Sequence, residues 1–320
     1  MSLKSIKKQV SYLQKKYLLL FHYLKYFSLN NSAEKKKIIV CFDGVINHGG
    51  LVDRLKGIIS FYQIAKTLDY DFYILFSHPF KLETLLEPAD LDWKLKNNQI
   101  KWHPFKTKLL YLVNNFNTKP LEIIKQSKAD TFYVYANIDY STSTFSDLTN
   151  LELETKWRND FNSLFKKSDF LNKKLEEVST ESYIAFHLRF TSIMGDFKDT
   201  TTNVLSENEK EKLQVYLLSV IKNKTKVLNK QAYVFSDSIN FINYITSNSN
   251  IKAIEGGQPL HMDNFEKDEN IQGHLKTLID FFMLGNSEII YFLKADKMYN
   301  SSFSKYAAIV GQTKFEHIEV

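Results

Sequence analysis

The chain contains the stretch Ile38-Ile39-Val40-Cys41-Phe42-Asp43-Gly44-Val45-Ile46-Asn47-His48-Gly49-Gly50-Leu51-Val52-Asp53-Arg54-Leu55. Its first five residues form a short apolar run, which predicts a buried strand. A loop with two adjacent glycines follows, and residues 51–68 then show helical periodicity. This order of strand, glycine-containing loop and helix predicts the opening unit of a Rossmann-like α/β fold.

The same alternation continues along the 320 residues. We expect strands at 38–42, 72–76, 131–136, 183–188, 232–235, 251–254 and 288–292, and helices at 51–68, 207–222, 238–247 and 272–284. Alternating strands and helices predict parallel sheets covered on both faces. We therefore predict an α/β protein with a leader helix at 1–37 and two Rossmann-like domains at 38–175 and 176–320.

The charge of the chain is unevenly distributed. Residues 1–37 contain nine lysines and one glutamate, a net charge of +8, which leaves −2 for residues 38–320 out of the total of +6. A nearly neutral body argues against nucleic acid as a partner. The single cysteine, Cys41, excludes an internal disulfide and a cysteine-based zinc site, and a cytoplasmic location is expected.

The basic leader has an apolar stripe at helical spacing, formed by Leu13, Tyr17, Leu20, Leu24 and Phe27. Interruptions by polar residues make it unsuitable as a membrane-spanning helix, and it lacks the cleavage site of a signal peptide. Two interpretations stay open. Residues 1–30 form a helix that lies on an anionic membrane surface, or they pack on the body of the protein.

Arginine is rare in this chain, because only three of the 42 basic residues are arginines. Two of these three stand in compact motifs, Arg54 after the glycine pair and Arg189 in His187-Leu188-Arg189, and the third is Arg158. A guanidinium can bind phosphate oxygens two at a time, which an ammonium cannot do. The two motifs therefore indicate sites for an anionic ligand.

The first motif, with His48, Gly49, Gly50, Asp53 and Arg54, lies where a helix begins. Backbone donors and the helix dipole favour a phosphate or another anion at such a place. The pattern lacks both the G-x-G-x-x-G spacing of nicotinamide folds and the G-K-[ST] of nucleotide hydrolases. An ordinary glycine turn is the alternative.

The second motif places His187 and Arg189 on one side of a strand at its carboxyl end, shortly before Asp196. Ligands of open α/β sheets bind at that end. The alternative is a hydrogen-bonded structural histidine and an arginine in a structural ion pair.

Two later clusters have the same character. Ser236 and Asp237 end a predicted strand, and Asp280 precedes an apolar segment, a strand and a polar cluster of Ser301, Ser302 and Phe303. Each cluster suits a phosphate or a nucleotide. Simple helix capping is the alternative for both.

In this order and spacing, the four elements resemble the GDP-fucose-dependent fucosyltransferases, a group that includes protein O-fucosyltransferases and α1,6-fucosyltransferases acting on glycans and Nod factors. The resemblance spans about residues 38–310. It implies a GT-B fold, in which two Rossmann-like domains face a cleft, and an inverting transferase that requires no metal or other cofactor.

The resemblance also implies roles for residues. Arg189 would bind the diphosphate and neutralise the leaving group, with His187 supporting the same site. Asp237 and Asp280 would contact the nucleotide, and Ser301, Ser302 and Phe303 would close over it. The residue that removes the acceptor proton stays open between His48 and Asp53.

The resemblance implies GDP-fucose as donor substrate and a glycan or glycolipid hydroxyl as acceptor. The missing cysteine pairs and signal peptide favour a bacterial cytoplasmic enzyme that builds surface polysaccharide. Two alternatives stay open: a GT-B transferase that uses another nucleotide sugar, and a non-catalytic sugar-nucleotide-binding assembly partner.

Overall fold

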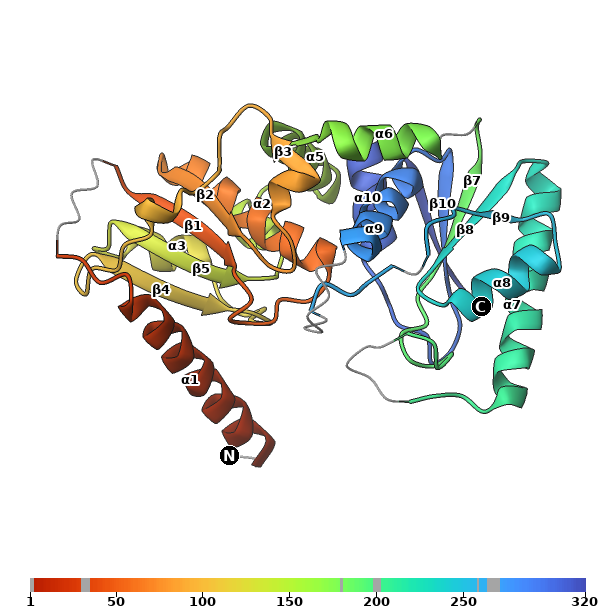
Figure 1. Ribbon diagram of the computed structural model, residues 1–320, viewed down its shortest axis with the longest axis horizontal. Helices are drawn as coiled ribbons and strands as arrows, with labels where there is room; N and C mark the ends of the chain where they lie inside the picture. Colours follow the sequence, from red (N-terminus) through yellow and green to blue (C-terminus); the bar gives the residue numbers. More distant parts are fainter. Residues whose placement is uncertain (1–2, 30–34, 179–180, 198–202, 258, 264–270) are drawn as a thin grey trace. The chain divides into compact units, whose positions relative to one another are not determined.

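The computed structural model describes residues 3–29, 35–178, 181–197, 203–257, 259–263 and 271–320 (Figure 1). The chain forms two compact units, Met1–Lys166 and Lys167–Val320, here called unit 1 and unit 2. Unit 2 begins at Lys167, whereas the sequence places the start of the second domain at residue 176. The intervening helix α6 (Asp169–Glu177) packs on α9 (Ile271–Gly285) of unit 2.

Unit 1 is built on a parallel sheet of four strands in the order β2-β1-β5-β4. These strands are β1 (Lys37–Phe42), β2 (Asp71–Phe76), β4 (Thr107–Leu112) and β5 (Thr131–Ala136). β1 is central and almost entirely buried because its run of apolar residues supplies both faces of the sheet. A two-stranded sheet pairs β3 (Leu86–Pro88) with β6 (Phe165–Lys167).

The helix α2 (Leu51–Leu68) begins and ends where its sequence pattern predicts, and it packs on β1, β2 and β5. It approaches β5 closely, since a Cβ on Gly57 would clash with the carbonyl oxygen of Ala136. The other helices of unit 1 are α3 (Pro120–Lys125), α4 (Ser141–Thr144) and α5 (Asn150–Leu164), with short 3-10 turns at Leu82–Thr84 and Asn97–Gln99.

Residues Leu3–Leu24 form the helix α1, which contacts β4. Its Leu19 and Tyr23 are fully buried in a cluster with Ile39, Cys41 and Tyr135 of the sheet, among others. Side chains alternate between the two faces of a strand, so Ile38 and Val40 of β1 point to the other face. α1 therefore covers one face of the unit 1 sheet.

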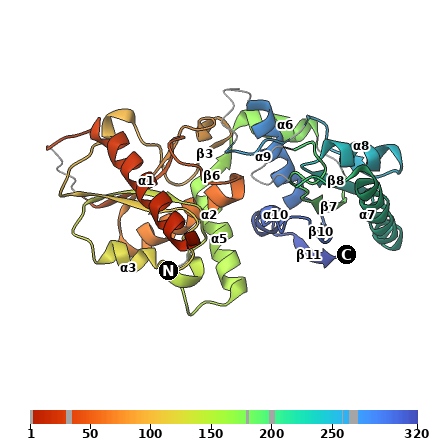
Figure 2. The ribbon, with the colours of Figure 1, turned by 90° about the horizontal axis from the view of Figure 1, so that it is seen from below.

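Unit 2 is built on a parallel sheet of five strands in the order β11-β10-β7-β8-β9. Its strands are β7 (Ile184–Leu188), β8 (Ala232–Ser236), β9 (Lys252–Ala253), β10 (Ile289–Lys294) and β11 (Lys314–Glu319). Figures 1 and 2 show helices on both sides of this sheet. The side chains of Phe186 and Leu188 pack with α7 (Glu207–Leu228) and α8 (Ile239–Ser247).

The opposite face of the unit 2 sheet is covered by α9 and α10 (Phe303–Gly311). Tyr183 donates a hydrogen bond to the carbonyl of Met283 in α9. The two helices approach each other closely where Gly285 meets Gly311. The predicted α/β class with parallel sheets is thereby confirmed, and each unit has the layered arrangement of a Rossmann-like fold.

Several elements differ from the sequence-based expectation. The Asn- and Lys-rich composition of 221–230 predicts solvated turns, but this stretch continues α7 as far as Leu228, because Ile221 is buried in the core and the helix ends only at the left-handed Asn229. The Ser- and Thr-rich composition of 141–150 predicts a loop, but this stretch begins with the one-turn helix α4. The strands β3, β4, β6 and β11 and the helices α3, α5, α6 and α10 were also not predicted.

Candidate functional site

The carboxyl ends of three neighbouring strands define the candidate site of unit 2. β7 ends at Leu188, β8 at Ser236 and β10 at Lys294, and these strands are parallel and adjacent. Arg189 therefore follows its strand at the same edge where Asp237 follows β8. Ligands bind at this edge in open α/β sheets.

Asp237 connects the two strand ends. Its Oδ1 accepts a hydrogen bond from the amide of Phe190 at 2.8 Å, and its Oδ2 accepts one from the amide of Thr191 at 2.7 Å. The same Oδ2 lies 3.2 Å from Nη1 of Arg189. Burial raises the pKa of Asp237, while the guanidinium and the two amides favour its charged form. One buried carboxylate thus holds both the Arg189 side chain and the turn that follows it.

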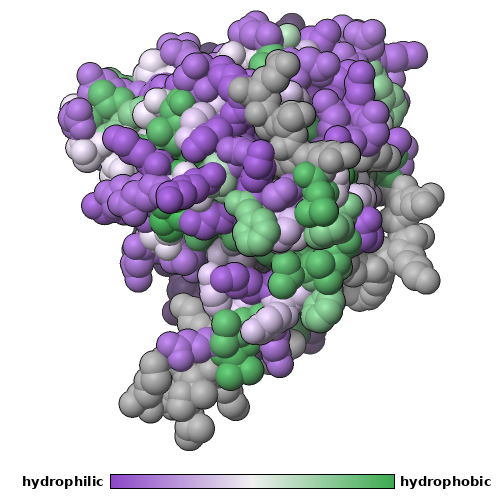
Figure 3. Space-filling model, turned by 90° about the vertical axis from the view of Figure 1, so that its left-hand side faces the viewer, coloured by the Kyte–Doolittle hydropathy of each residue, from purple (hydrophilic) through white to green (hydrophobic). Residues whose placement is uncertain are grey.

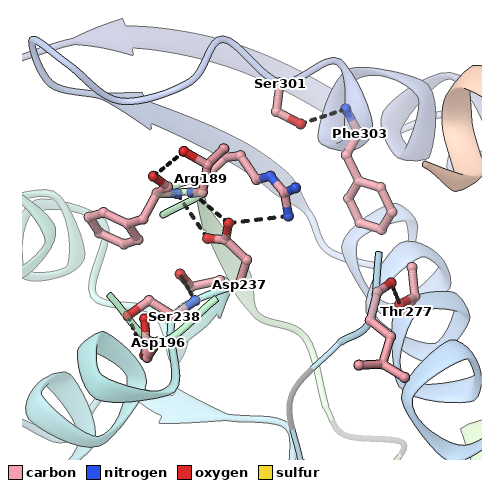
Figure 4. Close-up of polar contacts among 11 residues, drawn as sticks. Arg189, Asp196, Asp237, Ser238, Thr277, Ser301 and Phe303 are labelled. Atoms are coloured by element: carbon pink, nitrogen blue, oxygen red, sulfur yellow. Dashed lines mark hydrogen bonds and ion pairs between the residues drawn. The ribbon is translucent and has the colours of Figure 1, made fainter. Parts of the chain in front are cut away.

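The Arg189 guanidinium is partly exposed, with 19% of the side chain accessible. Its Cζ lies 4.6 Å from the centroid of the Phe197 ring, a cation–π contact. Figure 4 shows the guanidinium between Asp237 and the segment of Ser301 and Phe303. A planar donor group is therefore fixed at the edge of the sheet and still reaches solvent.

His187 joins β7 to the start of α10. Its Nδ1 lies 2.9 Å from Oγ of Ser304, and its ring lies tilted against the rings of Phe292 and Phe303, with centroids 5.4 and 5.6 Å away. Burial, with a smaller contribution from the Arg189 charge, lowers the pKa of His187 to about 3. The imidazole is thus neutral near pH 7, and it positions the first turn of α10 beside Arg189.

The segment before α10 is also tied to Arg189, because the amide of Tyr299 donates to the Arg189 carbonyl at 3.1 Å. Ser301 Oγ accepts from the amide of Phe303 at 3.2 Å, and the Ser302 side chain does not cap the helix. The first turn of α10 therefore presents backbone donors near a guanidinium, an arrangement that suits an anion.

Asp196 accepts hydrogen bonds at the start of α8 in this structure. Its Oδ2 accepts from Oγ of Ser238 at 2.9 Å and from the amide of Asn240 at 2.7 Å. Ser238 caps the same helix, and its amide donates to Oγ of the buried Ser236 at 3.1 Å. These three side chains brace the turn that carries Asp237.

Asp280 lies in the middle of α9 and is buried with Lys276, whose Nζ is 2.5 Å from Oδ1 of Asp280. Burial raises the pKa of Asp280, and the Lys276 ammonium opposes this change. The ring of the next residue, Phe281, meets Phe303 with centroids 5.5 Å apart. Lys276 and Asp280 thus lie in the helix that packs against α10. Nucleotide contact by Asp280 stays a prediction.

The residues predicted for unit 1 gather in the loop after β1. Gly49 has a φ of +90°, and a Cβ there would lie 2.5 Å from Oδ2 of Asp53, so a side chain fits poorly at this position. Gly50 precedes α2 without a side-chain cap. The Asp53 carboxylate is 42% exposed and lies 3.2 Å from Nζ of Lys56.

Arg54 and His48 are buried in the same loop. Arg54 donates from Nη1 to the carbonyl of His78 at 2.6 Å and from Nε to the carbonyl of Gly49 at 3.3 Å. Nδ1 of His48 lies 2.8 Å from the carbonyl oxygen of Ile46, and burial lowers the pKa of His48 to about 3. In this structure Arg54 stabilises the loop, and ligand contact by Arg54 or His48 stays a prediction.

The structure thus brings together eight predicted residues in unit 2 and five in unit 1, and it places Asp280 within α9. The unit 2 group is His187, Arg189, Asp196, Ser236, Asp237, Ser301, Ser302 and Phe303, with Asp280 beneath α10, and the unit 1 group is His48, Gly49, Gly50, Asp53 and Arg54. Phe197 and Lys276 were not predicted from the sequence. Only Lys276 carried a local signal, since it stands four residues before Asp280 on the same helix.

Within the described residues, no group of histidine, cysteine, aspartate and glutamate side chains is arranged to hold a metal ion. The groups at the unit 2 edge suit an anion. It consists of a fixed guanidinium, a helix start and buried groups that position both.

The fold resembles that of solved structures of fucosyltransferases. One solved structure that it resembles is the NodZ α1,6-fucosyltransferase soaked with GDP-fucose, with a TM-score of 0.54, 14% identity, and 86% of this chain and 92% of that chain covered. The same enzyme co-crystallised with GDP gives a TM-score of 0.53 and 14% identity over the same shares.

A second relative in structure is a mutant of Arabidopsis thaliana FUT1 in complex with GDP, with a TM-score of 0.56, 13% identity, and 93% of this chain and 73% of that chain covered. No protein-family model matches the chain, and no curated protein matches it. The resemblance noted in the sequence is confirmed at the level of the fold.

Proposed function

We propose that this chain is a glycosyltransferase that moves a sugar, fucose from GDP-fucose, to a hydroxyl group of a glycan or glycolipid. The observation that carries this proposal is the Arg189 guanidinium, which Asp237 fixes beside the first turn of α10. The negative charges of a nucleoside diphosphate complement the positive charge of this guanidinium. The fold, shared with enzymes solved with GDP and GDP-fucose, supports the same donor.

In the proposed reaction, the acceptor oxygen forms a bond to the anomeric carbon as the bond to the diphosphate oxygen breaks, which inverts the configuration. Negative charge then grows on the GDP leaving group. Arg189 and the amides at the start of α10 stabilise that charge, and fixed groups of this kind supply a large part of catalysis. No step requires a metal, so EDTA should leave the rate unchanged.

The acceptor proton needs a base, and unit 1 offers two. His48 is buried and its pKa is lowered to about 3, whereas the Asp53 carboxylate is partly exposed. We favour Asp53 because an acceptor hydroxyl can reach it. Asp53→Asn should lower kcat and leave GDP binding unchanged, while His48→Asn should act mainly through stability.

A ligand screen tests the donor. GDP, UDP and ADP, each free and as nucleotide sugars, are compared by the shift in melting temperature, because a ligand that binds only the folded state raises the midpoint. We expect GDP and GDP-fucose to give the largest shifts. A larger shift with UDP or ADP would identify another nucleotide sugar as the donor.

A transfer assay separates an enzyme from a non-catalytic binder. Purified protein with GDP-fucose should release GDP faster when glycan or glycolipid acceptors are added. Tight binding of GDP-fucose without release of GDP would favour an assembly partner. We further propose that the enzyme acts in the cytoplasm of a bacterium in the synthesis of surface polysaccharide, consistent with its single cysteine.

A further inference from the structure

The helix α1 has two apolar faces, and unit 1 uses only one of them. Leu19 and Tyr23 on the inner face are fully buried against the sheet. The Tyr23 hydroxyl lies 3.0 Å from the Tyr135 hydroxyl and 3.3 Å from Sγ of Cys41. These contacts place the inner face firmly on β1 and β5.

The second face points away from the sheet. At 3.6 residues per turn, Val10, Tyr17 and Phe21 lie on the side of the helix opposite Leu19 and Tyr23, and Leu13, Leu20 and Leu24 lie along one flank between the two sides. All of them are exposed, from 36% at Leu20 to 69% at Phe21. This outward face consists of Val10, Leu13, Tyr17, Leu20, Phe21 and Leu24. Four of these residues also belong to the apolar stripe seen in the sequence, so that stripe does not pack on the body of the protein.

The orientation of α1 is fixed at its carboxyl end. Nε2 of His22 lies 3.4 Å from Oδ2 of Asp43. The segment after the helix pairs with Trp102, because the Ser28 amide donates to the Trp102 carbonyl at 2.9 Å and the Trp102 amide donates to the Tyr26 carbonyl at 2.8 Å. Rotating the helix to bury its outward face would break these contacts and expose Tyr23. The outward face is therefore a permanent surface of unit 1.

The charge around this face selects the kind of partner. The α1 sequence contains five lysines and no acidic residue, and residues 1–37 carry +8 in total. Lys16 and Lys25 are exposed on this segment, and Lys15 lies over the ring of Tyr111. Pairing two copies through α1 would bring two strongly positive segments together, whereas an anionic lipid surface attracts them.

We propose that the outward face of α1 docks this protein on the surface of an anionic phospholipid bilayer. Its leucines and aromatic rings enter the boundary between headgroups and acyl chains, and the lysines contact the headgroups. Figure 3 shows hydrophobic side chains on the projecting lower part of unit 1, where α1 lies. No helix of the described residues is both long and apolar enough to cross a membrane.

A matched pair of double variants tests the apolar contribution. Leu13→Ser with Phe21→Ser removes one leucine and one phenylalanine from the outward face. Leu151→Ser with Phe116→Ser removes the same residue types from other exposed positions of unit 1. In flotation with vesicles of phosphatidylcholine and phosphatidylserine, the first pair should lose at least about tenfold in binding, and the second should bind like the native protein. Equal binding by both pairs would overturn the proposal.

The charge contribution is tested on the same vesicles. Lys16→Gln with Lys25→Gln should weaken binding about fivefold per lysine, while the exposed control pair Lys125→Gln with Lys128→Gln should have little effect. Native protein should also bind poorly to vesicles of phosphatidylcholine alone. Equal binding to neutral and anionic vesicles would overturn the choice of an anionic surface.

Sedimentation of the native protein without vesicles tests whether a second copy of the chain binds the outward face instead. We expect no dimer that depends on the outward face. A dimer that Leu13→Ser with Phe21→Ser abolishes would assign the face to a second copy and overturn the proposal. None of these measurements involves a nucleotide sugar, so failure here leaves the proposed transfer intact, and circular dichroism of each variant checks that it is folded.

Discussion

The carboxylate of Asp237 lies 3.2 Å from the guanidinium of Arg189 and also accepts hydrogen bonds from the amides of the two residues that follow Arg189. The side chain and the backbone of this arginine are therefore held by one group. Fixing a charge before the ligand arrives avoids the cost of reorganising it during the reaction. Both partners of this ion pair lie in the site, since Arg189 follows β7 and Asp237 follows the neighbouring strand β8.

Replacing Arg189 by alanine should lower kcat about a hundred- to a thousandfold, because the leaving diphosphate loses its charged hydrogen-bond donor. Arg189→Lys should recover only part of the rate, since an ammonium supplies the charge without the planar fork. The measurement is GDP release with donor and acceptor at saturation. Arg158→Ala is the control, and we expect it to keep full activity. An Arg189→Ala enzyme with native kcat would contradict the proposed role.

Replacing Asp237 by asparagine should affect both stability and donor binding. The amide oxygen of asparagine can accept only one of the two backbone hydrogen bonds, and the amide NH2 group then faces the other backbone N–H group. We expect the free energy of unfolding to fall by about 1–3 kcal/mol, the range for leaving a buried polar group unsatisfied. Urea unfolding measures this loss, and GDP titration should show weaker binding because Arg189 is no longer positioned.

Asp196→Asn provides the comparison for Asp237, since Asp196 accepts hydrogen bonds from Ser238 and Asn240 at the start of α8. We expect a smaller loss of stability, about 1 kcal/mol, as for other capping interactions. GDP affinity should fall less than in Asp237→Asn, because Asp196 supports the turn that carries Asp237, whereas Asp237 itself contacts Arg189. Equal losses of GDP affinity in both variants would mean that the whole edge, and not the Asp237 contact, determines donor binding.

The sequence predicted the positions of the site residues because strand ends are visible in a sequence. Short apolar runs located β7 and β8, and parallel pairing places their carboxyl ends together, which put Arg189 and Asp237 at one edge. The partners of Asp237 were not predictable in this way. Its amide donors come from residues 46 and 47 positions earlier in the chain, and no local pattern encodes such a contact.

Two of the elements that were not predicted, β11 and α10, lack a local signal in the sequence. β11 lies at the edge of its sheet and carries Lys314, Glu316 and Glu319, so it has no apolar run. α10 begins directly after a polar cluster and is only nine residues long. Its position depends on packing against α9 and on the His187–Ser304 hydrogen bond, which are tertiary contacts. Local periodicity cannot reveal either feature.

The close approach of α2 to β5 leads to a prediction about stability. A methyl group at position 57 would clash with the carbonyl oxygen of Ala136, and backbone atoms on both sides limit any relaxation. Gly57→Ala should therefore lower the free energy of unfolding by about 1–3 kcal/mol, the cost of overpacking a core, despite the better helix propensity of alanine. Thr67→Ala at an exposed position of the same helix should change stability by less than about 0.5 kcal/mol. A more stable Gly57→Ala protein would show that the helix can move away from the strand.

The neutral, buried His187 predicts how stability depends on pH. Burial lowers its pKa in the folded protein to about 3, against about 6.5 in an unfolded chain. Below pH 6.5 the unfolded state therefore gains a proton that the folded state does not bind, and stability falls as the pH falls through this window. The contribution is about 1.4 kcal/mol per pH unit for one proton.

His187→Asn removes this contribution and retains a group that can reach Ser304. The variant should be less stable than the native protein at pH 7, and the difference should shrink by about 2–3 kcal/mol between pH 6.5 and pH 4.5. His48, whose pKa is also lowered to about 3, is present in both proteins and cancels in the comparison. Urea unfolding of both proteins at several pH values measures the difference, with His317→Asn on the exposed edge strand as the control. A difference that stays constant with pH would mean that His187 is already charged in the folded protein, in which case it could not support the diphosphate site as a neutral hydrogen-bonding group.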